Sequence, residues 1–148
     1  MNIYHSAQDA PDVLPANSIV NADCFDVFDK VADASIDMIL CDLPYGTTQC
    51  KWDSVLPFDK LWAEYKRVLK PSGVVVLTAS QPLTSALVMS NLDMYKYDWY
   101  WEKDKGANFM FGNKMPLKNI ETISVFYNKQ PTYNPQKTIN PAGASRRH

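Results

Sequence analysis

Short apolar runs alternate along this chain with segments that have helical spacing. Residues 36–41 form an apolar run interrupted only by Asp37, and residues 74–79 form a second, β-branched run. Between them, residues 58–69 place apolar side chains at the spacing of an amphipathic helix. Because buried strands that alternate with helices build a layered sheet, we expect an α/β protein with a mainly parallel sheet. The run at 36–41 is expected to be buried on both faces.

The remaining segments continue this alternation within one domain, since 148 residues suit a single core. Residues 1–16 contain two prolines and no periodic pattern and are expected to be an N-terminal arm. Residues 17–128 are expected to fold, and residues 129–148 form a proline-rich basic tail. We further predict strands over 18–21, 95–101 and 121–127, helices over 24–31 and 81–91, and loops over 43–57 and 103–118.

Charge is distributed unevenly although the net charge is only −1. Residues 1–95 contain six Lys/Arg and twelve Asp/Glu, whereas residues 96–148 contain nine Lys/Arg and four Asp/Glu. Ten of the eighteen aromatic residues also lie from Tyr95 onward, interleaved with lysines. This mixture is typical of a surface that binds nucleic acid, and the alternative is a solvated lysine-rich surface over an aromatic core. The candidate DNA-binding residues are Lys103, Lys105, Lys114 and Lys118.

Several other classes of protein do not fit the sequence. The three cysteines lack the paired spacing of a zinc site, and the two histidines lie near the ends of the chain, so no metal site is expected. The longest aliphatic run, residues 74–77, is far too short to cross a membrane. Because no secretory signal is visible either, a cytoplasmic protein without a membrane partner is expected.

The tetrapeptide Asp42-Leu43-Pro44-Tyr45 directly follows the first apolar run. In open α/β sheets, ligands bind beyond the carboxyl ends of the strands. A carboxylate and a backbone carbonyl that accept both hydrogens of a nucleobase amine would release its nitrogen lone pair for attack. Pro44 restricts the local backbone, and Tyr45 could stack on a flipped base. The alternative is a common turn, with Asp42 bonded to the loop and Tyr45 packed in the core.

Three sequence elements together resemble one enzyme family. Residues 42–46, Asp-Leu-Pro-Tyr-Gly, resemble the catalytic motif of amino-methylating DNA methyltransferases, which usually reads Asp-Pro-Pro-Tyr. Residues 21–24, Asn-Ala-Asp-Cys, resemble the Gly-Asp-Cys element that precedes this motif in the beta class, whose motif order is permuted. Residues 69–73, Leu-Lys-Pro-Ser-Gly, are similar to the turn before the fifth strand of many S-adenosylmethionine-dependent enzymes.

The resemblance implies a Rossmann-like methyltransferase sheet, S-adenosylmethionine as cofactor and double-stranded DNA as partner. An initial aspartate, rather than serine or threonine, resembles the adenine-modifying members. Asp42, Pro44 and Tyr45 match the catalytic positions, while Asp23, Cys24 and Asp42 match positions that contact the cofactor. Asp23 is also placed to cap the helix expected at 24–31, which is the alternative role for its carboxylate.

One part of the family pattern is missing from this sequence. The glycine-rich loop that receives part of the cofactor should follow the recognition region, and no such loop occurs before His148. We therefore expect residues 17–128 to be a partial catalytic domain, incomplete at its C-terminus, with weak or no cofactor binding. The strands that would flank residues 36–41 are also absent, so this strand becomes an edge and the strand at 18–21 loses its neighbours. A homodimer could cover that edge.

Other functions remain open from the sequence. Within the enzyme class, the alternatives are methylation of the amino group of cytosine or of an RNA base. A non-catalytic nucleic-acid-binding remnant would use the basic aromatic half alone. A plain α/β interaction domain would bind no DNA.

Overall fold

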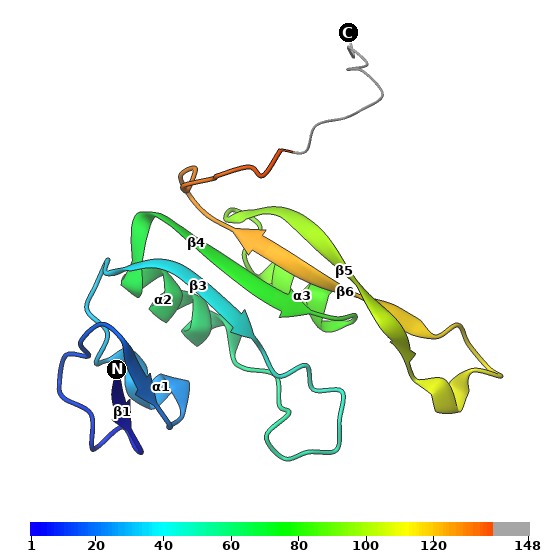
Figure 1. Cartoon of the computed structure of the whole chain (residues 1–148), viewed down its shortest axis with the longest axis horizontal. Coiled ribbons are helices and arrows are strands. Elements are labelled where there is room, and N and C mark those ends of the chain that lie inside the picture. The colour runs from blue at the N-terminus through cyan, green and yellow to red at the C-terminus, as the bar shows by residue number, and fades with distance from the viewer. Residues whose placement is uncertain (138–148) are drawn as a thin grey trace, which may run out of the picture.

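The computed structural model of the chain describes residues 1–137, so part of the expected tail at 129–148 lies outside the described residues. The elements in chain order are β1 (Asn2–Tyr4), β2 (Ser18–Val20), α1 (Cys24–Phe28), β3 (Ile36–Asp42), α2 (Phe58–Val68), β4 (Leu69–Ala79), α3 (Leu83–Ser90), β5 (Tyr95–Ala107), the 3-10 turn η1 (Phe109–Phe111) and β6 (Lys118–Phe126). The alternation of strands and helices predicted over residues 36–90 is therefore present. Figure 1 shows their arrangement.

The main sheet has four strands in the order β3-β4-β6-β5. β3 and β4 are parallel, whereas β6 is antiparallel to both β4 and β5. The prediction of a mainly parallel sheet is therefore wrong for these strands. The cause is the hairpin formed by β5 and β6, which places β6 between β5 and β4 and antiparallel to both. β1 and β2 form a separate parallel pair.

Helices cover one face of this sheet (Figure 1). The apolar side of α2 is buried as its spacing predicts, and α3 buries Leu83 and Leu87 beside it. Leu77 and Phe126 contribute fully buried side chains from the sheet. Burying such a side chain contributes about 1.5–3 kcal/mol, so this layer is the main source of stability. The core residues of α2 are Leu61, Trp62, Tyr65 and Val68.

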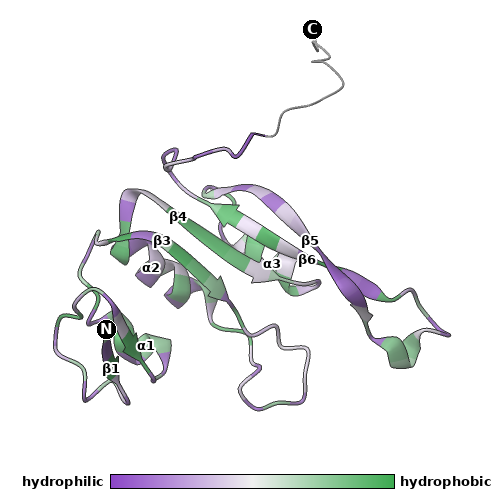
Figure 2. Cartoon of the chain, viewed as in Figure 1, coloured by the Kyte–Doolittle hydropathy of each residue, from purple (hydrophilic) through white to green (hydrophobic). Residues whose placement is uncertain are grey.

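The opposite face of the sheet has no helix over it in the part of the chain that the structure describes (Figure 1). On β3, Met38 and Leu40 are 50% and 67% exposed, while Ile39 and Cys41 pack against the core. The prediction that β3 is buried on both faces is therefore wrong. β3 is nevertheless an edge strand, as expected. Figure 2 shows that β3, β4 and β6 are rich in hydrophobic residues.

The N-terminal segment is more ordered than its sequence suggests. Residues 2–4 of the expected arm form β1, which pairs with β2 in register. The strand predicted at 18–21 therefore has a neighbour, contrary to our expectation. α1 ends at Phe28 rather than residue 31, after which turn-type hydrogen bonds continue the backbone.

The predicted loop at 103–118 is partly strand. β5 runs to Ala107 and β6 begins at Lys118, so only the tip between them is irregular. The extension of β5 beyond residue 101 was not predicted. Both faces of β5 are largely exposed, so its outer part lacks the apolar pattern by which a buried strand is recognised in a sequence. The hairpin projects from the body of the molecule (Figure 1). Among the described residues, no helix has both the length and the apolar character needed to cross a bilayer.

Candidate active site

Asp42 lies at the carboxyl end of β3 and is oriented by two hydroxyl groups. Tyr45 donates a hydrogen bond of 3.0 Å from Oη to Asp42 Oδ1, and the Thr78 hydroxyl donates to the same oxygen. The two hydroxyls also lie 3.2 Å apart, within hydrogen-bond distance. Asp42 and Thr78 are register partners of the parallel pair β3–β4. Asp42 Oδ2 accepts no hydrogen bond from residues 1–137 and remains available to a ligand.

Tyr45 remains a neutral hydroxyl at physiological pH. Burial raises the pKa of Tyr45 to about 12, and the nearby carboxylates of Asp42 and Glu121 act in the same direction. A neutral phenol donates to the aspartate instead of repelling it. The sequence left two roles open for Tyr45, contact with a base or packing in the core. In the structure Tyr45 is partly buried against the core, and it also lines a cavity. Leu43, in place of the usual proline, is buried at 5% exposure and anchors the motif to the core.

The loop that follows the motif is fixed by a second carboxylate, Asp53, which the sequence analysis did not single out. Asp53 accepts backbone N–H bonds from Gly46, Thr47 and Thr48 at 2.8, 2.9 and 2.7 Å. Hydrogen bonds from the Thr48 side chain and these N–H groups lower the pKa of Asp53 to about 2. The side chain is only 8% exposed. We call residues 46–53 the Asp53 loop.

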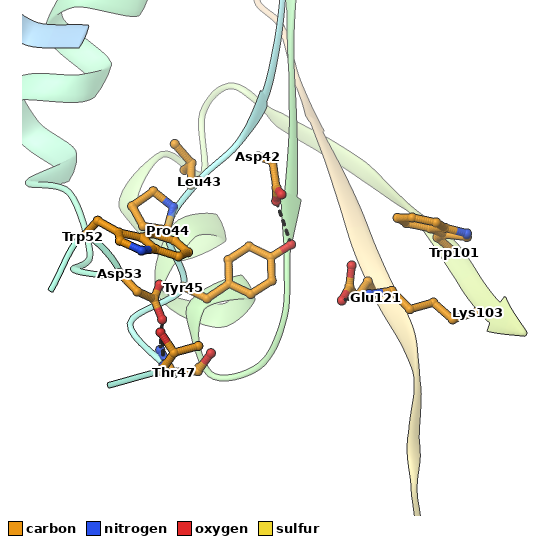
Figure 3. A pocket seen from close by; sticks show the side chains of 11 residues that line it. Asp42, Leu43, Pro44, Tyr45, Thr47, Trp52, Asp53, Trp101, Lys103 and Glu121 are labelled. Atoms are coloured by element: carbon orange, nitrogen blue, oxygen red, sulfur yellow. Dashed lines mark hydrogen bonds and ion pairs between the residues drawn. The ribbon is translucent and has the colours of Figure 1, made fainter. Parts of the chain in front are cut away.

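A cavity of about 340 Å³ opens between the motif and the β5–β6 hairpin, and we call it the Asp42 cavity. Figure 3 shows Trp52 on the side of Pro44 and Tyr45, and Trp101 on the opposite side. Glu121 also lines the cavity and pairs with Lys103. The Lys103 ammonium lies 5.2 Å from the centre of the Trp101 ring. The cavity is therefore lined by aromatic rings with carboxylates between them.

A second cavity of about 420 Å³ lies beside the first, and both are lined by Tyr45, Lys103 and Glu121. In this second cavity, the Lys118 ammonium donates to the hydroxyl of Ser80, which directly follows β4. Of the four lysines predicted to bind DNA, the structure thus brings Lys103 and Lys118 to the cavities. The other two, Lys105 and Lys114, are exposed on the hairpin away from both.

The predicted cofactor residues Asp23 and Cys24 do not line the Asp42 cavity. Asp23 caps α1 by accepting the Phe25 N–H at 2.8 Å, which was the alternative role given to it. Partial burial, the Asp23 carboxylate and the nearby Cys41 raise the pKa of the Cys24 thiol. Cys41 directly precedes Asp42 on β3. The start of α1 therefore lies near the end of β3 but outside the Asp42 cavity. Within residues 1–137, no cluster of three or more His, Cys, Asp or Glu side chains suits a metal ion.

Glu121, Thr78 and Asp53 were missed by the sequence analysis for different reasons. Glu121 was the first residue of a predicted strand, but its place at the cavity depends on β6 lying next to β4. Thr78 reaches Asp42 only through the pairing of β3 with β4. Asp53 follows Trp52 within a loop. No sequence pattern around it indicates that its side chain accepts hydrogen bonds from residues 46–48.

No protein-family model matches the chain, whereas solved structures do. M1.HpyAVI, solved in complex with SAM, superposes with a TM-score of 0.61 at 17% identity, over 94% of this chain and 62% of its own. TTHA0409 of Thermus thermophilus, complexed with S-adenosyl-L-methionine, gives 0.54 at 16% identity, over 93% of this chain and 59% of its own. The chain has the fold of the S-adenosylmethionine-dependent methyltransferases. The methyltransferase fold implied by the resemblance of residues 21–24, 42–46 and 69–73 is therefore confirmed.

This methyltransferase fold is also found in a third neighbour of stated specificity. The PvuII DNA methyltransferase, which is specific for cytosine N4, gives a TM-score of 0.51 at 14% identity, over 74% of this chain and 48% of its own. This chain thus spans less than two thirds of each solved chain to which we compare it.

Proposed function

We propose that this chain is the target-base part of a DNA amino-methyltransferase that methylates the exocyclic amine of a flipped adenine. The observation that carries the proposal is the orientation of Asp42. Its Oδ1 is occupied by the hydroxyls of Thr78 and Tyr45, whereas Oδ2 accepts no hydrogen bond from the described residues, and Asp42 lines a cavity of about 340 Å³. Pockets of this size hold small organic ligands.

The proposed chemistry depends on making the amine nitrogen more nucleophilic by hydrogen bonds to both of its hydrogens. Asp42 Oδ2 accepts one hydrogen, and a backbone carbonyl of the motif accepts the other, so the nitrogen lone pair is no longer delocalised into the ring. Pro44 keeps that carbonyl in place without a mobile side chain. After transfer, the nitrogen loses one proton, which the carboxylate of Asp42 is positioned to accept.

S-adenosylmethionine would supply the methyl group on a sulfonium centre, where the C–S bond breaks as the N–C bond forms. The residues assigned to it by resemblance are compatible with binding. One oxygen of Asp23 caps α1, and the other accepts no hydrogen bond from the described residues, so it can accept from an adenine amino group. Cys24 is exposed beside it.

Adenine is proposed as the base because the motif begins with aspartate. The nearest competing function is methylation of cytosine N4, and the likeness to the PvuII enzyme is the observation that favours it. The partner common to both is double-stranded DNA. A remnant that binds nucleic acid without catalysis is the third candidate, supported by the exposed lysines and aromatic rings of the hairpin.

The decisive experiment is product analysis by mass spectrometry. DNA is incubated with the chain and excess S-adenosylmethionine, digested to nucleosides and searched for N6-methyladenine and N4-methylcytosine. We expect N6-methyladenine to form. Replacement of Asp42 by Ala should lower its yield by roughly 10²-fold or more while leaving DNA affinity unchanged, because one acceptor of the amine is removed.

The matched control is Asp37→Ala, which removes an exposed carboxylate from the same strand, away from the cavity. It should leave the yield unchanged. Formation of N4-methylcytosine alone would correct the base, and equal yields from wild type and Asp42→Ala would favour the non-catalytic remnant.

We also propose that the chain holds the cofactor weakly without further polypeptide. Its sequence contains no glycine-rich loop, and it covers 62% or less of each solved chain named above. Titration calorimetry with S-adenosylmethionine should therefore detect weak binding or none. Micromolar affinity of the 148-residue chain would contradict this proposal.

A further inference from the structure

Trp52 is an exposed tryptophan on the wall of the Asp42 cavity. It is 73% exposed, more than Trp101, which also lines the cavity and is 52% exposed, whereas Trp62 is 4% exposed in the core. Trp99 is also exposed, on β5, but it does not line this cavity. An exposed aromatic ring at the rim of a cavity costs hydrophobic free energy in the absence of a ligand and is typical of a binding site.

The backbone next to Trp52 is constrained by hydrogen bonds. The neighbouring Asp53 accepts three backbone N–H bonds of 2.7–2.9 Å from the other end of the same loop. Gly46 adopts φ +67°, and a Cβ there would lie 2.9 Å from the Val55 side chain, so the turn requires glycine. The loop therefore presents Trp52 beside the motif without the freedom of an ordinary surface loop.

We propose that Trp52 stacks on the flipped nucleobase in the Asp42 cavity and that Asp53 is the positioning residue that keeps it there. This inference rests on the proposed function and adds a base-contacting residue outside the tetrapeptide. Figure 3 shows Trp52 and Trp101 on opposite sides of the cavity, with Asp42 and Glu121 between them.

The side chains that line the Asp42 cavity favour a flat heteroaromatic ligand that carries an amine. Aromatic rings contact the faces of such a ligand, and the free Asp42 Oδ2 accepts from its amine. An apolar peptide side chain would leave this carboxylate oxygen unpaired in the cavity, which is unfavourable. The second carboxylate, Glu121, already pairs with Lys103, which balances its charge.

The test measures binding to bases and requires no methyl transfer. The full chain is titrated with a single-stranded oligodeoxyadenosine and with an abasic oligomer that has the same number of phosphates, and affinity is followed by fluorescence anisotropy. We expect tighter binding to the oligomer that carries bases. Trp52→Ala should reduce affinity for that oligomer roughly tenfold or more without changing affinity for the abasic one. Trp52→Phe, which keeps a ring, should retain most of the difference.

Two further variants test the role of Asp53. Asp53→Ala should lose the preference for bases as Trp52→Ala does, whereas Asp53→Asn should retain part of it, because the amide oxygen still accepts N–H bonds. Circular dichroism reports whether each variant folds, and if Asp53→Ala does not fold, the Trp52 pair and Asp53→Asn decide the inference.

Trp99→Ala is the matched control, because Trp99 is an equally large exposed ring outside the cavity. The inference is overturned if wild type binds both oligomers equally, if Trp52→Ala keeps the preference, or if Trp99→Ala loses as much affinity. These outcomes are distinct from failure of the proposed function, which is an absence of methylated base in DNA.

Discussion

Asp42 acquires its orientation from a side chain 36 positions away in the sequence, Thr78. A carboxylate at a strand end would otherwise rotate freely in water or bond to its own loop. Here Thr78 and Tyr45 hold one oxygen of a carboxylate that lines the cavity, and the other oxygen accepts no hydrogen bond from residues 1–137. The tetrapeptide alone therefore does not make the site, because the neighbouring strand must supply a hydroxyl at the matching register position.

Asp53 gives a prediction for acidic pH. Its pKa falls from 3.8 to about 2 in the folded chain, so the folded state binds this proton less tightly than the unfolded state does. The stabilisation by this carboxylate is complete above about pH 4 and is lost as the pH falls from 3.8 through 2. We expect the amides of Gly46, Thr47 and Thr48 to be protected from hydrogen exchange at pH 5 and to lose that protection near pH 2, as measured by NMR.

Asp53→Asn is the control for this titration, since it has no proton to gain. Its loop amides should be less protected at pH 5, and any further loss down to pH 2 should follow only the global unfolding of the chain. A wild-type loop whose protection follows only the global unfolding of the chain would contradict the prediction.

The β5–β6 hairpin carries all four lysines predicted to bind DNA, yet its geometry divides them into two pairs. Lys103 and Lys118 are turned to the cavities and already contact Glu121 and Ser80. Lys105 and Lys114 lie on the exposed outer part, near the 3-10 turn at 109–111. Phosphate contacts made by the outer pair would bind DNA without distinguishing its sequence.

The outer pair gives a prediction for salt dependence. Each phosphate contact contributes about 0.9 to the slope of log affinity against log salt. The double variant Lys105→Ala/Lys114→Ala should therefore bind duplex DNA more weakly, with a slope shallower by about 2. Fluorescence anisotropy at several salt concentrations measures this slope.

The matched control exchanges two exposed lysines of α2, Lys60→Ala/Lys66→Ala, and should leave the slope unchanged. Equal slopes for wild type and the hairpin variant would show that the outer hairpin makes no phosphate contact.

The molecule has one well-covered sheet face and one bare one. α2 and α3 bury the first, while β3 is an edge strand whose Met38 and Leu40 side chains are exposed on the second. An uncovered apolar face next to an unpaired strand edge is a ready interface for another chain. We propose that a second copy of this chain covers the edge of β3.

Dimerisation through β3 predicts a concentration-dependent mass in analytical ultracentrifugation. Leu40→Lys should shift the chain to monomer, because a charge would be buried at the interface without a partner. Met89→Lys is the control, since Met89 is an exposed methionine on α3, at 68% exposure. A wild-type chain that is monomeric at all concentrations would contradict the proposal.

Local patterns in the sequence were sufficient for the alternation of strands and helices over residues 36–90 and for the candidate motif at 42–45. Apolar spacing and proline act on the backbone nearby, so these features are visible without knowledge of the fold. The bare face of β3 was not visible, because an apolar run looks the same whether one or both of its faces are covered. The place of β6 between β4 and β5 was missed for a similar reason, since strand order depends on long-range pairing.

The site shows the same division. The sequence was enough to propose Asp42, Pro44 and Tyr45, whereas Thr78 and Glu121 become part of the site only when distant strands meet. A hydrogen bond or cavity wall between such residues depends on the register of the sheet, and register results from the packing of the whole core. The tertiary structure was therefore needed to learn which oxygen of Asp42 is free and which residues surround it.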